Sequence, residues 1–71
     1  MKKEDIKFSY APLWKLLIER NIKKSELRDL TGIAASTFTK MAKNEQVSLD
    51  VVARISLALQ CGLDDIVSIT K

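Results

Sequence analysis

Residues 24–43, KSELRDLTGIAASTFTKMAK, are the most informative stretch of the sequence, because two short amphipathic segments flank a single glycine. The first segment, 24–31, places Leu27 on its apolar side. Gly32 follows directly, where a residue with positive φ commonly ends a helix. The second segment is predicted to form a helix from about residue 35 to residue 43. The stretch is therefore expected to be two helices joined by a tight turn.

The second segment has two different faces. Its apolar residues stand three and four positions apart and share one side of a helix: Phe38, Met41 and Ala42. The opposite side carries small polar and cationic residues at the same kind of spacing: Ser36, Lys40 and Lys43. A helix of this kind, braced by a preceding one, suits the major groove of DNA. The same pattern also occurs in small helical domains whose charges are only solvated, so that alternative stays open.

The charge distribution favours a polyanionic partner. Residues 20–43 carry six basic and two acidic side chains, a charge of +4. Residues 44–71 carry two basic and four acidic ones, a charge of −2, and the whole chain carries +3. Positive charge is thus concentrated on the predicted pair of helices, as binding to DNA phosphates requires.

Size and composition limit the possible functions. The 71 residues are expected to form one domain, 1–71, with residues 1–5 frayed at the N-terminus. The chain has no histidine, one cysteine and two glycines, which excludes the usual zinc site and a glycine-rich phosphate loop. We therefore expect no catalytic residues, no metal or other cofactor, and no small-molecule ligand. The single cysteine and the lack of a 20-residue apolar stretch predict a cytoplasmic protein without a membrane span.

Three further helical segments are predicted, which brings the total to five. The first begins at Pro12 and ends near Arg20. Ser48 is expected to cap a fourth helix that Gly62 ends, and residues 63–67 are expected to form a last short helical turn. Asn44 is predicted to end the second motif helix in the left-handed conformation.

The two ends of the chain have complementary patterns. Residues 6–10, IKFSY, alternate apolar and polar side chains, which indicates a half-buried strand or an extended segment over the helices. Residues 67–69 alternate in the same way. Our hypothesis is that the two segments pair as a small two-stranded sheet.

The order and spacing of these segments resemble the Cro/CI-type (XRE-like) helix-turn-helix family of bacterial and phage repressors. The resemblance covers about residues 10–67 and includes the motif residues Leu27, Gly32, Ile33, Phe38 and Met41, and the tail residues Ile55, Leu59, Gly62, Leu63, Asp65 and Ile66. It implies an all-α, compact, five-helix lambda-repressor-like DNA-binding domain. The sequence departs from the family at Arg28, where a small residue is usual, and at Ala34, where Ser or Thr often caps the helix.

The resemblance also implies which residues contact double-stranded DNA. The residues expected to contact bases lie at the start and on the outer face of the second motif helix: Ala35, Ser36, Thr37 and Lys40. The residues expected to hold phosphates flank them: Lys23, Lys24, Arg28, Lys43 and Asn44. One module this small makes few base contacts, so a homodimer on DNA is expected. Leu57 is a candidate for the dimer contact because it is an apolar residue on the outer side of the fourth helix.

Three functions are compatible with these residues. The leading hypothesis is a small sequence-specific transcriptional regulator that acts as a repressor. The alternatives are an antitoxin-like protein and an adaptor, both of which would use the fold mainly to bind another protein. Salt dependence distinguishes them, because binding through phosphates weakens steeply as salt rises.

Overall fold

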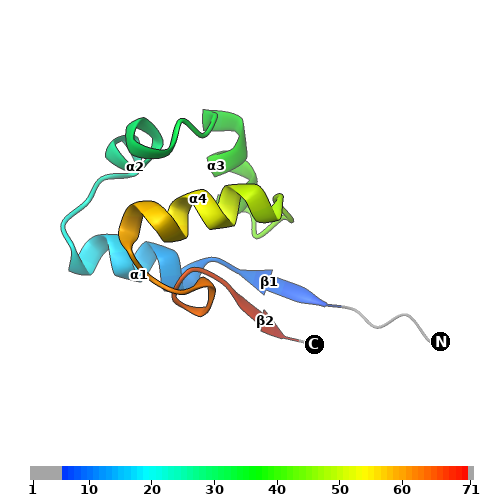
Figure 1. Ribbon diagram of the computed structural model, residues 1–71. Coiled ribbons are helices and arrows are strands. Elements are labelled where there is room, and N and C mark those ends of the chain that lie inside the picture. The colour runs from blue at the N-terminus through cyan, green and yellow to red at the C-terminus, as the bar shows by residue number, and fades with distance from the viewer. Residues whose placement is uncertain (1–5, 71) are drawn as a thin grey trace.

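The computed structural model describes residues 6–70, which form four α-helices, one short 3₁₀ helix and a two-stranded sheet (Figure 1). In chain order the elements are β1 (Lys7–Ser9), α1 (Ala11–Glu19), α2 (Lys24–Thr31), α3 (Ala35–Ala42), α4 (Leu49–Leu59), η1 (Leu63–Asp65) and β2 (Ser68–Thr70). In Figure 1, α4 lies between the α2–α3 pair and a layer made by α1 and the sheet. The predicted fraying of residues 1–5 concerns positions outside the described residues.

The two motif helices have the bounds that the sequence predicts, within one residue. Gly32 follows α2 with a φ of 69°, and its N–H donates to the Arg28 carbonyl oxygen at 2.8 Å. This is the left-handed position that a residue without a Cβ adopts at no steric cost. Asn44 has a φ of 58° just after α3, so its predicted left-handed conformation is confirmed.

The prediction of five helices is wrong by one, because residues 63–67 do not complete an α-helical segment. Only Leu63–Asp65 are helical, and they form a single 3₁₀ turn. Ile66 is fully buried, and its carbonyl oxygen accepts a hydrogen bond from the N–H of Leu13 at 3.2 Å. This tertiary contact fixes the turn against α1, and the chain then becomes extended to form β2.

Helix α4 begins as predicted and ends earlier than predicted. The Ser48 hydroxyl accepts from the Val51 N–H at 3.3 Å, which confirms the cap. The helix ends at Leu59 because Gln60 adopts the left-handed conformation, with a φ of 53°, and Gly62 instead precedes η1. The Arg20 guanidinium donates to the Leu59 carbonyl oxygen, so a side chain beyond α1 helps to satisfy the end of α4.

The predicted pairing of the two chain ends is confirmed. Strands β1 and β2 are antiparallel, with Lys7 opposite Thr70 and Phe8 opposite Ile69. Figure 1 shows both strands leaving the helical body side by side. The alternation in the two segments therefore corresponds to two strands, which bring the two ends of the described chain side by side.

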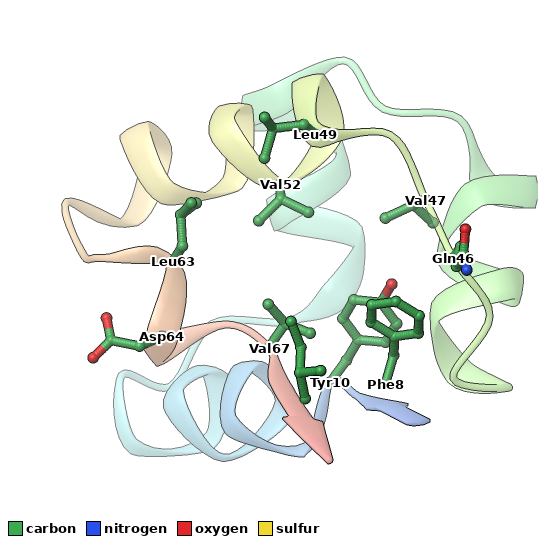
Figure 2. A pocket seen from close by; sticks show the side chains of 10 residues that line it. Phe8, Tyr10, Gln46, Val47, Leu49, Val52, Leu63, Asp64 and Val67 are labelled. Atoms are coloured by element: carbon green, nitrogen blue, oxygen red, sulfur yellow. The ribbon is translucent and has the colours of Figure 1, made fainter. Parts of the chain in front are cut away.

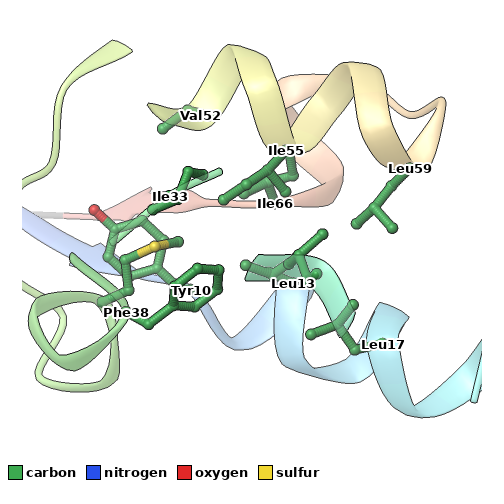
Figure 3. Close-up of a cluster of buried hydrophobic side chains, with 11 residues drawn as sticks. Tyr10, Leu13, Leu17, Ile33, Phe38, Val52, Ile55, Leu59 and Ile66 are labelled. Atoms are coloured by element: carbon green, nitrogen blue, oxygen red, sulfur yellow. The ribbon is translucent and has the colours of Figure 1, made fainter. Parts of the chain in front are cut away.

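Buried hydrophobic side chains from all four α-helices meet in one core (Figure 3). Its members are Tyr10, Leu13, Leu17, Leu27, Ile33, Phe38, Met41, Val52, Ile55, Leu59 and Ile66. Burying each such side chain contributes about 1.5–3 kcal/mol relative to leaving it exposed. The inward positions of Leu27, Phe38 and Met41 are confirmed. Ala42 is exposed, contrary to its predicted place on the apolar face, because it lies at the very end of α3.

Candidate nucleic-acid interface

Helix α3 is anchored from one side only. Phe38 is 7% exposed and Met41 is fully buried, so both fix the helix against the core. Ser36, Lys40 and Lys43 are exposed on the other side, as their spacing predicts. The apolar anchors therefore determine which small and cationic side chains face outward.

The start of α3 lacks a capping side chain. Ala34 adopts the extended conformation of an N-cap residue, with a φ of −66° and a ψ of 149°, and among residues 6–70 no side chain accepts a hydrogen bond from this end of α3. An alanine at this position costs about 1 kcal/mol relative to Ser or Thr. The Thr37 N–H donates to the Ala34 carbonyl oxygen at 3.1 Å, whereas the N–H groups of Ala35 and Ser36 have no acceptor among residues 6–70 and are left for an external one.

The residues predicted to contact bases are not equally exposed. Ala35, Ser36 and Lys40 are exposed, whereas Thr37 is half-buried. Thr37 and Lys40 border a shallow hollow of about 490 Å³ that is also lined by the loop before α4, including Gln46. Gln46 was not predicted from the sequence; a loop amide has no periodicity to indicate what it lies against.

The basic residues predicted to hold phosphates are all exposed: Lys23, Lys24, Arg28 and Lys43. Lys23 and Lys24 stand at the start of α2, with Arg28 one turn further along it, and Lys43 follows α3. The candidates thus come from the two motif helices and the residues that adjoin them.

Asn44 has a structural contact that the sequence did not indicate. Its Oδ1 accepts from the Tyr10 N–H at 3.2 Å, and the Tyr10 hydroxyl donates to the Glu45 carbonyl oxygen at 2.8 Å. These two hydrogen bonds connect the turn after α3 to the start of α1. The Asn44 amide N–H groups are the part of its side chain that is left for a phosphate.

One of the predicted phosphate contacts lies over an aromatic ring. The Lys24 Nζ is 4.2 Å from the centroid of the Trp14 ring. Trp14 is half-buried in α1 and packs against the core. The contact of Trp14 with Lys24 joins two helices and could not be predicted from spacing.

Charge compensation is uneven over the molecule. Within residues 6–70 the structure shows one ion pair, between Arg54 Nε and Asp50 Oδ2 of α4 at 2.9 Å. The candidate phosphate-binding cations have no such partner among these residues.

Burial raises the pKa of the Tyr10 hydroxyl and of the Cys61 thiol, and the Asp65 carboxylate raises the pKa of Cys61 further.

No cluster of three or more His, Cys, Asp or Glu side chains is found within residues 6–70. None of the helices among these residues has the length and apolar character needed to cross a bilayer.

A second surface feature is an apolar groove, whose lining includes no residue of α2 or α3. It lies between the sheet and the start of α4 (Figure 2), and its volume is about 470 Å³. Its lining includes Phe8, Val47, Leu49, Leu63 and Val67.

Exposed leucines occur on α4 as well as in the groove. Leu57 is 80% exposed, so its predicted outward position is confirmed, and Leu49 is 70% exposed. Leu49 is the first residue of α4, and the buried residues of this helix begin only at Val52.

Comparison with known proteins agrees with the geometry. Residues 12–71 match the family model of the Cro/C1-type HTH DNA-binding domain. A crystal structure of the transcriptional regulator VanUg is similar over 99% of this chain and 93% of that chain, with 44% sequence identity and a TM-score of 0.92. No curated protein gives a match. The chain therefore belongs to the Cro/C1-type helix-turn-helix DNA-binding family.

Proposed function

We propose that this protein is a small transcriptional regulator that binds a specific double-stranded DNA sequence with α3 in the major groove. The observation that carries the proposal is the outer face of α3, where Ser36 and Lys40 are exposed while Phe38 and Met41 hold the helix from behind. A rigidly held helix with small and cationic outer side chains fits the groove. The family match and the similarity to the regulator VanUg support the same function.

Base contacts in this proposal come from four residues of α3. Lys40 donates to guanine O6 and N7, and Ser36 donates to or accepts from base edges. Ala35 packs against a thymine methyl group. Thr37, which is half-buried, contacts a base at the edge of the site, beside the hollow that Gln46 also lines.

Phosphate contacts in this proposal flank α3 and fix its register. Lys23, Lys24 and Arg28 bind one stretch of backbone from α2. Lys43 and the Asn44 amide group bind another stretch from the end of α3. Each phosphate neutralised in this way adds about −0.9 to the slope of log K against log salt concentration.

We also propose that the protein acts as a repressor and as a homodimer on DNA. A protein seated in the major groove at a promoter excludes other proteins from the same base pairs. Two copies double the number of base contacts and match the two-fold symmetry of many operators. Leu57, 80% exposed on α4, is the proposed dimer contact.

The exposed leucines favour one competing function, in which the fold binds a different protein as an adaptor or an antitoxin. Leu49, Leu57 and Leu63 are 70%, 80% and 45% exposed, which is compatible with an apolar partner. Such a contact depends weakly on salt, whereas DNA binding depends strongly on it.

An electrophoretic shift with DNA from the flanking genome tests the proposal. We expect a complex that survives competitor DNA and weakens steeply between two salt concentrations. Lys15→Ala should bind this DNA as the unchanged protein does, since Lys15 is an exposed lysine of α1 outside the proposed site. A complex that is insensitive to salt, or no complex with any duplex, contradicts DNA binding and favours the protein partner.

A further inference from the structure

We propose that Trp14 is a positioning residue for DNA binding, whose ring holds the Lys24 ammonium in place for a backbone phosphate; this inference rests on the proposed function. The Lys24 Nζ lies 4.2 Å from the ring centroid, within the roughly 6 Å range of a cation–π interaction. Trp14 belongs to α1 and Lys24 is the first residue of α2. The contact therefore connects a helix of the core to the beginning of the motif.

The ring is a fixed platform. Trp14 is half-buried and packs against the core, to which Leu13 and Leu17 of the same helix also belong. Lys24 is exposed, so its ammonium reaches solvent and the ring together. A long lysine side chain that would otherwise sample many rotamers is thus held in one region before DNA arrives.

A ring face suits this purpose better than a carboxylate does. Within residues 6–70 no carboxylate lies at ion-pair distance from Lys24. A carboxylate would neutralise the ammonium and compete with phosphate. An aromatic face attracts the cation through its quadrupole and leaves the charge and N–H donors available. Ordering one such side chain before binding is expected to strengthen the complex about two- to tenfold.

The neighbouring lysine provides a matched control. Lys23 has the same charge and is also exposed. Its backbone N–H donates to Glu26 Oε1 at 3.2 Å, and within the described residues its ammonium makes no cation–π contact. Removing the Lys23 charge therefore reports phosphate binding without the ring.

A double-mutant cycle measured on a mixed-sequence DNA duplex at low salt tests the inference, because a phosphate contact does not require the operator. The variants are Trp14→Leu, Lys24→Met and the double substitution. We expect Trp14→Leu to weaken binding about two- to tenfold when Lys24 is present and to have no effect in the Lys24→Met protein. The salt slope should stay unchanged in Trp14→Leu and become shallower by about 0.9 in Lys24→Met.

A purely structural role of Trp14 gives a different pattern. In that case Trp14→Leu weakens binding equally with and without Lys24, and the inference is overturned. Tighter binding by Trp14→Leu also overturns it, because the ring would then compete with the phosphate. If Trp14→Leu does not fold, Trp14→Phe takes its place as the test variant. It retains an aromatic face, so it should keep most of the affinity for the duplex.

Fluorescence provides a readout that needs no change at Trp14, which is the single tryptophan of the chain. Binding of the duplex should alter the emission of the wild-type protein and of Lys23→Met, and should leave the emission of Lys24→Met unchanged. An equal change in Lys24→Met refutes the inference while DNA binding stands. If the wild-type protein binds no duplex, both the inference and the proposed function fail.

Discussion

The motif half of the molecule and the closing half share one core but have different surfaces. Residues 20–43 carry a charge of +4, whereas residues 44–71 carry −2. Both halves supply buried side chains, such as Phe38 from α3 and Ile55 from α4. The closing half has the Asp50–Arg54 ion pair and the exposed Leu57 on its outside. The requirement for a common core thus leaves the outer faces free to differ, and the positive charge of residues 20–43 supports the proposal that this half meets DNA.

The largest expected effect comes from breaking the core that joins the two halves. Phe38→Ala should lower the free energy of unfolding by about 3–5 kcal/mol, because it leaves a cavity where a 7% exposed ring had been. Leu30→Ala, on the 66% exposed Leu30 of the same motif, should change it by less than about 0.5 kcal/mol. Urea unfolding followed by circular dichroism measures both. A stable, cooperative Phe38→Ala protein would mean that the inner and outer faces of α3 are wrongly assigned.

The next largest effect is expected on DNA binding by the motif half. Lys40→Ala should cost about 1–3 kcal/mol on the cognate site and relax preference at one or two base pairs, because Lys40 is proposed to contact bases. Lys43→Ala should weaken all sequences alike and reduce the salt slope by about one. Titrations against single-base operator variants at two salt concentrations separate the two roles. If Lys40→Ala preserves the order of preference, Lys40 holds a phosphate instead.

A smaller effect is expected on the closing half. Leu57→Glu should leave folding unchanged, since Leu57 is 80% exposed, and should prevent dimers if this surface joins two copies. Sedimentation with and without operator DNA measures the assembly. The control is Asp50→Ala, which changes a charge on the same helix at a 70% exposed side chain. Dimers that persist in Leu57→Glu place the interface elsewhere, with the apolar groove of Figure 2 as the next candidate.

The smallest expected effect on the free energy of unfolding appears only at high pH, at Tyr10, whose hydrogen bonds connect the start of α1 to the turn after α3. Burial raises the pKa of Tyr10 above its ordinary value of 10.0. The unfolded chain therefore loses this proton first, so the stability is fully present below about pH 10 and is lost as pH rises through the folded-state pKa. The chain has one tyrosine, so phenolate absorbance reports Tyr10 alone. Ionisation at or below the ordinary value would contradict its burial.

The bounds of the motif were predictable because local residues set them. Gly32 and Asn44 favour the left-handed conformation, and Ser48 caps α4 with its own hydroxyl. The end of α4 was not predictable in this way. Arg20 reaches the Leu59 carbonyl oxygen across 39 positions of sequence, and the helix ends at Gln60 in the left-handed conformation, two residues before the predicted end at Gly62. Contacts between distant residues override local preference there.

The candidate site shows the same division. Spacing alone predicted that Ser36 and Lys40 face outward, and both are exposed. Thr37 is half-buried and lines one hollow together with the loop before α4, whose position the sequence does not indicate. The hydrogen bond from Tyr10 to Asn44 spans 34 positions, and no local pattern could have indicated it. The base and phosphate contacts themselves stay predictions.

The pairing of β1 with β2 has a consequence for the order of folding. Lys7 and Thr70 stand at opposite ends of the described chain, so nearly all of it must be closed into a loop before they meet. Loop-closure entropy makes such a contact unfavourable until the helices have already shortened the distance. We therefore expect the strands to join late and to open first, so that their amides exchange with solvent before those of α4.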